Sequence, residues 1–309
     1  MVLSRVTLSR LALLLLAAGG QLSRAEAAAP AAAEDTADYL RLERDAKGRP
    51  LALETAIVRF APKQGDAKGP TVDLIGAVHI ADKQYFDELN KEFENYDVVL
   101  YELVAPEGTR IAKGGGGRSS HPVAALQNGM KSVLELEHQL EHVDYQKDNL
   151  VHADMSPDDF SRSMKNKGES FLTMYFRLMG AGLAMQSAAG PGASSDAAIL
   201  MALFDKDRAL SLKRLMAEQF EKMEVAMSAL DGPEGSTLLA ERNKIALKGL
   251  QKQLDAGKQK IAIFYGAGHL PDMARRLETE FQLEPESTRW VRAWDLRSPA
   301  QRKAEKSGR

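Results

Sequence analysis

Apolar runs in the first third of the chain predict two strands. Residues 51–60 (LALETAIVRF) and 71–78 (TVDLIGAV) are rich in aliphatic and β-branched side chains, which pack well on the pleated surface of a sheet. The segment 62–70 between them carries Pro and Gly residues that are typical of a turn. We therefore expect two consecutive strands over these residues.

A helix and a third strand are expected next. Four apolar residues recur with helical spacing: Tyr85, Phe86, Leu89 and Phe93. This spacing predicts a helix that buries one face. Residues 97–104 (DVVLYELV) are again apolar and predict a buried strand. The order strand, helix, strand predicts parallel strands joined by a right-handed crossover.

The same order returns near the C-terminus. Ser236 is a suitable N-cap for a helix over residues 238–256, and Gly257 suits the position after its end. The elements expected after this helix are a strand over 259–265, a helix over 270–281 and a last strand over 290–296. Both halves of the chain thus predict strand–helix–strand units of a central sheet.

The middle of the chain predicts a long, nearly all-helical insert at about 118–230, after the glycine-rich loop 114–117. Ser156 and Pro157 are typical of a helix start, and one or two further helices are expected over 196–230. The methionines of this region are adaptable core residues or, alternatively, line a pliable groove for a peptide or apolar substrate.

The first residues predict export. MVLSRVTLSRLALLLLAAGG places Arg5 and Arg10 ahead of a short apolar run, which is the order of a secretory signal peptide. The run is shorter than the ~20 residues that cross a bilayer. We therefore expect cleavage and no stable membrane anchor afterwards, with an uncleaved anchor as the alternative.

The predicted fold class is α/β, with a central, mostly parallel sheet built from strand–helix–strand units and a long helical insert. The predicted organisation is a signal peptide at 1–27, a linker at 28–38 and a single α/β domain at 39–309. We expect the mature protein to be periplasmic or secreted.

Composition narrows the chemistry. The chain has 41 basic and 43 acidic residues and a formal charge of −2, so it carries no basic stripe for phosphates and no nucleic-acid partner is expected. Without cysteine, neither a thiol nucleophile nor a cysteine metal site is available. Any metal must be held by His, Asp or Glu, and the six histidines narrow the search.

Two predicted strands end in the same Gly-x-x-His motif, at residues 76–79 and 266–269. Ligands of open parallel sheets bind beyond the carboxyl ends of the strands, so His79 and His269 are expected to converge there. The glycines of these motifs are expected to let the backbone approach a bound cofactor: Gly76, Gly266 and Gly268. A single strand-end histidine is more often capped or solvated, and it is the duplication that favours a site.

Glu102 adds a carboxylate to the two histidines. It falls on the same strand face as Val98 and Leu100, where an ionised group needs a partner or a metal. The set His79, Glu102 and His269 matches the ligands of a catalytic metal site for Zn²⁺, Mn²⁺ or Co²⁺.

Arg242 and Asn243 fall inside the apolar arc of the predicted helix 238–256. An arginine in that position pairs with a carboxylate or stabilises an oxyanion. Glu102, Arg242 and Asn243 are therefore candidate catalytic residues. The alternative is that Arg242 and Glu102 form a purely structural bridge.

These landmarks resemble the TraB/Tiki superfamily and its TraB/GumN-like exported members. The resemblance rests on GAVH, YELV about twenty residues later, and AERN before a strand that ends in GAGH, and it covers residues 72–103 and 238–277. It implies an α/β fold related to the erythromycin esterase-like (EreA) and ChaN-like haem-uptake proteins. Tiki members are described as metal-dependent proteases that use Mn²⁺ or Co²⁺, which implies that His79, Glu102 and His269 lie at the metal or catalytic centre.

Three functional hypotheses follow. The first is a metal-dependent hydrolase, and foremost a peptidase acting on a peptide or protein substrate, in which Glu102 is a ligand or the general base. The second is a non-catalytic exported binding protein for a metal, haem or a signal peptide. The third is metal-free ester hydrolysis with a histidine as base.

The other histidines and the polar segment after them are weaker candidates. His138 and His142 are four residues apart, which predicts a shared, solvated helix face. Around His152, the acidic residues Asp144 and Asp154 precede a helix start, and a site role for either is a second-rank hypothesis.

Overall fold

The computed structural model describes residues 39–63, 69–106, 108–109, 111, 134–169, 200–230 and 236–307. The predicted signal peptide and linker lie outside these residues, as does much of the predicted insert. In the described part of the chain, no helix combines the length and the apolar character needed to cross a membrane.

A seven-stranded mixed sheet forms the centre of the fold. Its strands, in spatial order, are β1 (Leu40–Arg44), β2 (Pro50–Pro62), β3 (Thr71–Ala77), β8 (Lys260–Gly266), β5 (Val98–Tyr101) and β7 (Leu150–His152), with β9 (Leu283–Asp295) paired to β2. The strands β3, β8, β5 and β7 are parallel, whereas β1, β2 and β9 pair antiparallel. The predicted α/β class with a central sheet is thereby confirmed.

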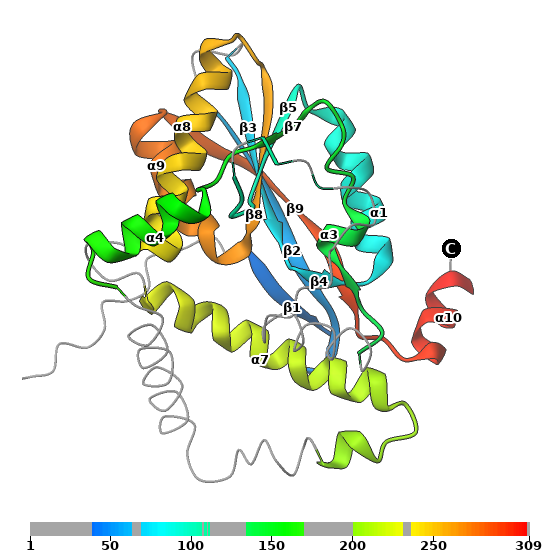
Figure 1. Ribbon diagram of the computed structural model, residues 1–309. Helices are drawn as coiled ribbons and strands as arrows, with labels where there is room; N and C mark the ends of the chain where they lie inside the picture. The colour runs from blue at the N-terminus through cyan, green and yellow to red at the C-terminus, as the bar shows by residue number, and fades with distance from the viewer. Residues whose placement is uncertain are drawn as a thin grey trace, which may run out of the picture. The chain divides into compact units, whose positions relative to one another are not determined.

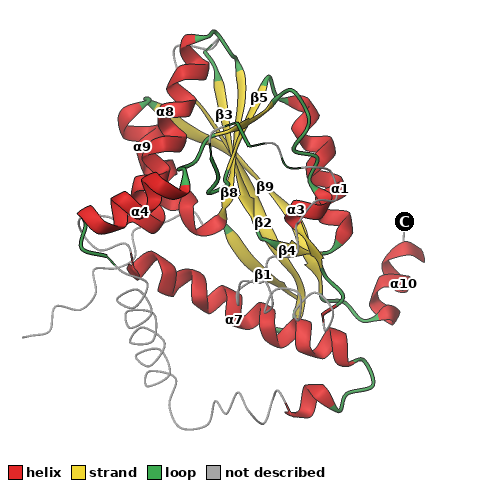
Figure 2. Ribbon diagram, in the orientation of Figure 1, coloured by secondary structure: helices red, strands yellow, loops and turns green. Residues whose placement is uncertain are grey.

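Helices cover both faces of this sheet. Figure 1 shows α8 (Arg242–Asp255) and α9 (Leu270–Glu280) on one side and α1 (Lys83–Glu92) on the other. Further helices among the described residues, red in Figure 2, include α3 (Gln139–His142), α4 (Pro157–Asn166), α7 (Arg208–Leu230) and α10 (Pro299–Ser307). Short 3₁₀ turns occupy Phe93–Asn95 and Ala267–His269, and a two-stranded ladder joins β4 (Ile80–Ala81) to β6 (Glu137–His138).

The strand order differs from the simplest interpretation of the sequence. The predicted strand–helix–strand unit is present as β3, α1 and β5, but β8 lies between its two strands and pairs with both. The C-terminal half of the chain therefore inserts its strand into the centre of the N-terminal unit. This long-range pairing carries no local sequence pattern, whereas the parallel direction of the strands does follow from the helical crossover.

The prediction that the insert is nearly all helical is wrong at two places. β7 lies within the predicted insert and extends the main sheet at its edge. His138 belongs to β6 and not to a helix face shared with His142. Strands of two or three residues are too short to show the alternation by which strands are recognised in a sequence.

Predicted helix ends are found where side chains or glycine satisfy the backbone. The Ser156 hydroxyl accepts from the N–H of Asp159 at the start of α4, as the sequence predicts. Ser236 likewise accepts from Leu239 N–H, but the turn it opens is π-helical over Thr237–Glu241 before α8 begins. Gly257 follows α8 with φ +80°, a conformation that favours glycine.

The helix α8 packs closely against the parallel half of the sheet. A Cβ on Gly249 would be in ordinary contact with Ala153 Cβ at 3.4 Å and with Leu100 Cδ1 at 3.8 Å, so this part of the helix lies against β5 and the residue that follows β7. Next to Gly249, Leu250 is fully buried.

Replacing Leu250 with Ala should lower the free energy of unfolding by about 2–5 kcal/mol, because the cavity left in the helix–sheet contact cannot fully collapse. Chemical denaturation measures this change. The exposed neighbour Lys248, replaced with Ala, is the control and should change stability by no more than about 0.5 kcal/mol. Equal effects of the two substitutions would contradict the packing described.

Candidate functional site

The carboxyl ends of the parallel strands bring the site together. Glu102 follows β5, Asp154 follows β7, and His269 lies in the 3₁₀ turn after β8. His79 follows β3. Since parallel strands end at one edge of a sheet, residues far apart in the sequence meet here.

The guanidinium of Arg242 is the centre of this cluster. Its Nε and Nη2 donate to the two oxygens of Asp154 at 2.9 and 2.6 Å, and Nη2 also donates to Glu102 Oε1 at 2.6 Å. The exposed fractions of the side chains are 8% for Arg242, 0% for Asp154 and 12% for Glu102. One buried cation is therefore shared by two carboxylates, and the paired bonds to Asp154 fix its plane.

Glu102 is held as an anion. Its second oxygen, Oε2, accepts from the backbone N–H of Gly266 at 2.7 Å. Burial alone would raise the pKa of this carboxyl, but its electrostatic interactions with His269 and Arg242 outweigh burial. His79 and the Gly266 N–H act in the same direction, and the pKa of Glu102 falls to about 2.

His269 is held in one neutral form. The Asn243 amide nitrogen donates to the His269 carbonyl at 3.1 Å and to Asp272 Oδ2 at 2.9 Å. Asn243 Oδ1 therefore faces His269 Nδ1, 2.7 Å away, and a carbonyl oxygen can only accept, so Nδ1 carries the hydrogen. Arg242 Nη1 donates to the other ring nitrogen, Nε2, at 3.4 Å. Burial, aided by the charge of Arg242, lowers the pKa of His269 to about 4.

His79 is the exposed member of the site. Its Nδ1 lies 3.3 Å from Gln139 Oε1, whereas its electrostatic interactions reach both Glu102 and His269. The structure thus brings Glu102, Arg242, Asn243 and His269 into direct contact, and His79 borders them from the neighbouring strand.

The three predicted glycines differ in what they contact. A Cβ on Gly266 would lie 3.3 Å from Glu102 Oε2, so Gly266 allows its N–H to reach that carboxylate. A Cβ on Gly76 would meet the backbone oxygens of Tyr39 and Ala56 at 3.2 and 3.3 Å, which makes Gly76 part of the sheet packing. A Cβ on Gly268 would meet no atom within 4 Å.

The fit of a metal to the predicted ligands depends on Arg242. Two ligands of one Zn²⁺ can be at most about 4.2 Å apart, and His269 Nε2 lies 3.7 Å from Glu102 Oε1. However, the Arg242 guanidinium already donates to both of these atoms. As arranged here, the donors do not fit an ion between them, because Arg242 is the cation in that position.

A different group of side chains has metal-binding spacing. Among the described residues, the ligand atoms of Glu137, Glu141 and His142 all lie within 4.8 Å of one another. The group is half-buried, His142 Nε2 lies 3.2 Å from Glu137 Oε2, and the imidazole stacks on Phe86. A histidine paired with a carboxylate explains these contacts without an ion.

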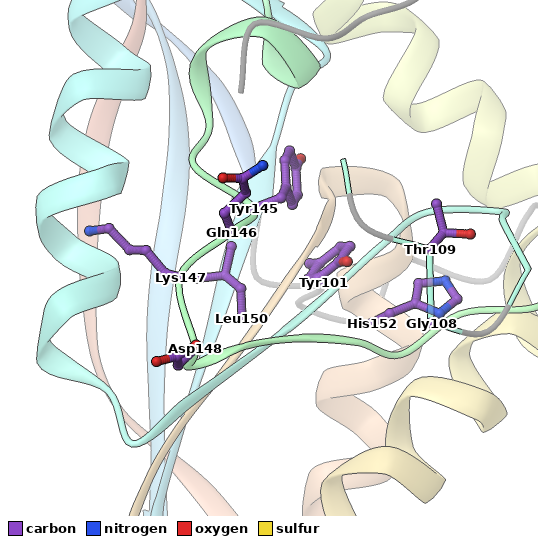
Figure 3. Close-up of a pocket in the computed structure, with 9 residues that line it drawn as sticks. All are labelled: Tyr101, Gly108, Thr109, Tyr145, Gln146, Lys147, Asp148, Leu150 and His152. Atoms are coloured by element: carbon purple, nitrogen blue, oxygen red, sulfur yellow. The ribbon is translucent and has the colours of Figure 1, made fainter. Parts of the chain in front are cut away.

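A pocket of about 180 Å³ is lined in part by Leu150 and His152 of β7. Figure 3 shows the rings of Tyr101, Tyr145 and His152 at this pocket, while the side chain of Lys147 extends away from them. His152 Nε2 lies 2.6 Å from the carbonyl of Leu103. The polar segment around His152 therefore builds a pocket wall as well as supplying Asp154.

Two residues of this site have weak signals in the sequence. Asp154 follows β7 as Glu102 follows β5, but a strand of three residues is too short to be recognised from its sequence pattern. Gln139 belongs to no recognisable sequence motif. It is identified as a site residue only by the position of its amide beside His79 in the structure.

No family model, no curated protein and no solved structure matches this chain. The resemblance to the TraB/Tiki superfamily therefore rests on its motifs alone.

The buried, neutral His269 predicts a pH dependence of stability. A pKa lowered from 6.5 to about 4 means that the unfolded chain binds a proton more readily, so the free energy of unfolding should fall as pH decreases from 6.5 to 4. The contribution is about 3 kcal/mol. Urea denaturation across this range measures it. In His269→Gln this component should be missing, and an unchanged pH slope in the variant would contradict the assignment.

Proposed function

We propose that this chain is a hydrolase whose reaction takes place at the strand-end cluster of His79, Glu102, Arg242 and His269. The observation that carries the proposal is the buried guanidinium, which is fixed by two carboxylates and donates to the imidazole of His269, while His79 interacts electrostatically with Glu102 and His269. A preorganised cation next to a base is the arrangement that hydrolysis of a carbonyl compound requires.

His79 is the better general base of the two candidates. Both oxygens of Glu102 accept hydrogen bonds, from Arg242 and from Gly266, and a carboxyl with a pKa of about 2 binds a proton too weakly for that role. His79 is exposed and so reaches water and substrate. It takes a proton from the attacking water and returns it to the leaving group.

Arg242 supplies the stabilising charge. Its Nη1 uses one hydrogen for His269, and within the described residues the other hydrogen has no acceptor. That hydrogen is available for the oxyanion that forms as water adds to a carbonyl carbon. Asp154 and Glu102 hold the guanidinium in place, so no reorganisation is needed during the reaction.

The substrate class proposed is an ester or peptide outside the cytoplasm. The predicted export signal and the resemblance to TraB/Tiki proteins support a peptide. The bonds from Arg242 to both Glu102 and His269 support a route with a histidine base. Metal dependence, with Mn²⁺, Co²⁺ or Zn²⁺, stays a prediction of the ligand set His79, Glu102 and His269 and of the family resemblance.

His79→Gln should reduce kcat by about 10²–10⁴-fold, because the general base is lost, while the melting temperature is unchanged. The assay uses panels of chromogenic esters and fluorogenic peptides. His142→Gln is the matched control and should keep wild-type turnover, since His142 contacts Glu137 and Phe86 and not the site. Equal turnover of His79→Gln and wild type would remove His79 from the mechanism.

The same assay after exhaustive chelation separates the two routes. Activity should survive, because the proposed cation is an arginine. Loss of activity that Mn²⁺, Co²⁺ or Zn²⁺ restores would contradict the metal-free route and favour the metal-dependent hydrolase. A folded protein that cleaves no member of either panel would favour the non-catalytic binding protein.

A further inference from the structure

We propose that Gln139 is a positioning residue that holds His79 in the tautomer with hydrogen on Nδ1, so that Nε2 carries no hydrogen in either site histidine. The functional meaning of this inference rests on the proposed hydrolysis, but the tautomer itself does not. Gln139 is 5% exposed and lies sixty residues from His79 in the sequence.

Gln139 is attached to His79 at two points. Its backbone N–H donates to the His79 carbonyl at 2.9 Å, and the adjoining residues Ile80 and His138 are partners in the β4–β6 ladder. The second point is the side chain, whose Oε1 lies 3.3 Å from His79 Nδ1. The backbone contact fixes where the amide stands relative to the ring.

The orientation of the amide determines the tautomer. Gln139 Nε2 donates to the hydroxyl oxygen of Tyr145 at 2.7 Å, which leaves Oε1 facing His79. A carbonyl oxygen only accepts. With the amide in this orientation, the hydrogen between them is on His79 Nδ1, and the lone pair is on Nε2.

The two histidines of the site are thus held in the same way. A buried amide binds Nδ1 of each ring, Gln139 for His79 and Asn243 for His269. Fixing one ring nitrogen decides what the other can do. With Nδ1–H bound to an amide oxygen, Nε2 of His79 can accept a proton, and the resulting imidazolium keeps its hydrogen bond to Gln139.

Two histidines outside the site, His142 and His152, have the opposite arrangement. His142 Nε2 faces the Glu137 carboxylate at 3.2 Å, and His152 Nε2 faces the Leu103 carbonyl at 2.6 Å. Both acceptors require hydrogen on Nε2. The protein therefore contains histidines expected in each of the two tautomers, and these can be compared in one spectrum.

Nitrogen NMR of the full chain labelled with ¹⁵N-histidine tests the inference. Long-range ¹H–¹⁵N correlations at neutral pH distinguish the tautomers of each ring, and single His→Gln variants assign the signals. His79 and His269 should show Nδ1–H, and His152 should show a protonated Nε2. A wild-type His79 with hydrogen on Nε2 would mean that the amide is reversed, and would overturn the proposal.

Variants of Gln139 test the cause. In Gln139→Leu, His79 should become a mixture of tautomers while His269 is unchanged, and Asn243→Leu should have the converse effect. Gln139→Glu should retain Nδ1–H, because a carboxylate also accepts, and it replaces the leucine variant if that protein does not fold. A His79 that stays entirely Nδ1–H in folded Gln139→Leu would contradict the role of Gln139.

Failure of this inference is distinguishable from failure of the proposed function. The tautomers are measured without substrate, so Nδ1–H on His79 in a protein without hydrolytic activity would refute only the hydrolase. Hydrolysis that depends on His79, in a protein whose His79 carries hydrogen on Nε2, would refute only the positioning role.

Discussion

The burial of Arg242 is the constraint on which the arrangement of the site depends. A guanidinium removed from water costs several kcal/mol unless carboxylates compensate it, and here Asp154 and Glu102 do so at 2.6 Å each. These acids follow two different strands, and Arg242 begins a helix. The ion pairs therefore tie β5, β7 and α8 to one point at the carboxyl edge of the sheet.

This constraint also explains why the site is polar yet ordered. Each side chain beside Arg242 has a second partner that fixes its direction: Gly266 N–H for Glu102, Met155 N–H for Asp154, and Asn243 for His269. Buried polar networks of this kind cost stability unless every member is paired. Because its members are paired and fixed in direction, this network is preorganised for charge that develops in a reaction.

Local pattern accounts for the part of the fold that the sequence could predict. The helix over Lys83–Glu92 and the cap at Ser156 follow from spacing and side-chain chemistry. The pairing of β8 with both β3 and β5 does not follow from local pattern, because it joins residues more than 160 positions apart. The last strand begins at Leu283, whereas the sequence predicts a start near Trp290. The first half of this strand is mostly exposed and carries no apolar run, so the sequence pattern does not reveal it.

The sequence likewise predicts only part of the candidate site. The repeated Gly-x-x-His motif and the buried arc of the helix indicated His79, His269, Arg242 and Asn243. Asp154 and Gln139 are not indicated as clearly by the sequence, because the role of each depends on a partner distant in sequence: Arg242 for Asp154, and His79 for Gln139. The partner of a side chain is known only once the chain is folded, whereas hydrophobic periodicity can be seen in the sequence of a single segment.

The most direct test of this account is to measure the free energy of unfolding of Arg242→Met at neutral pH. The account predicts a loss of about 3–5 kcal/mol, because two carboxylates are left without their cation. Arg162→Met removes an exposed pair with Asp159 and should cost at most about 1 kcal/mol. A loss no greater for Arg242→Met than for Arg162→Met would contradict the claim that a buried guanidinium organises the site.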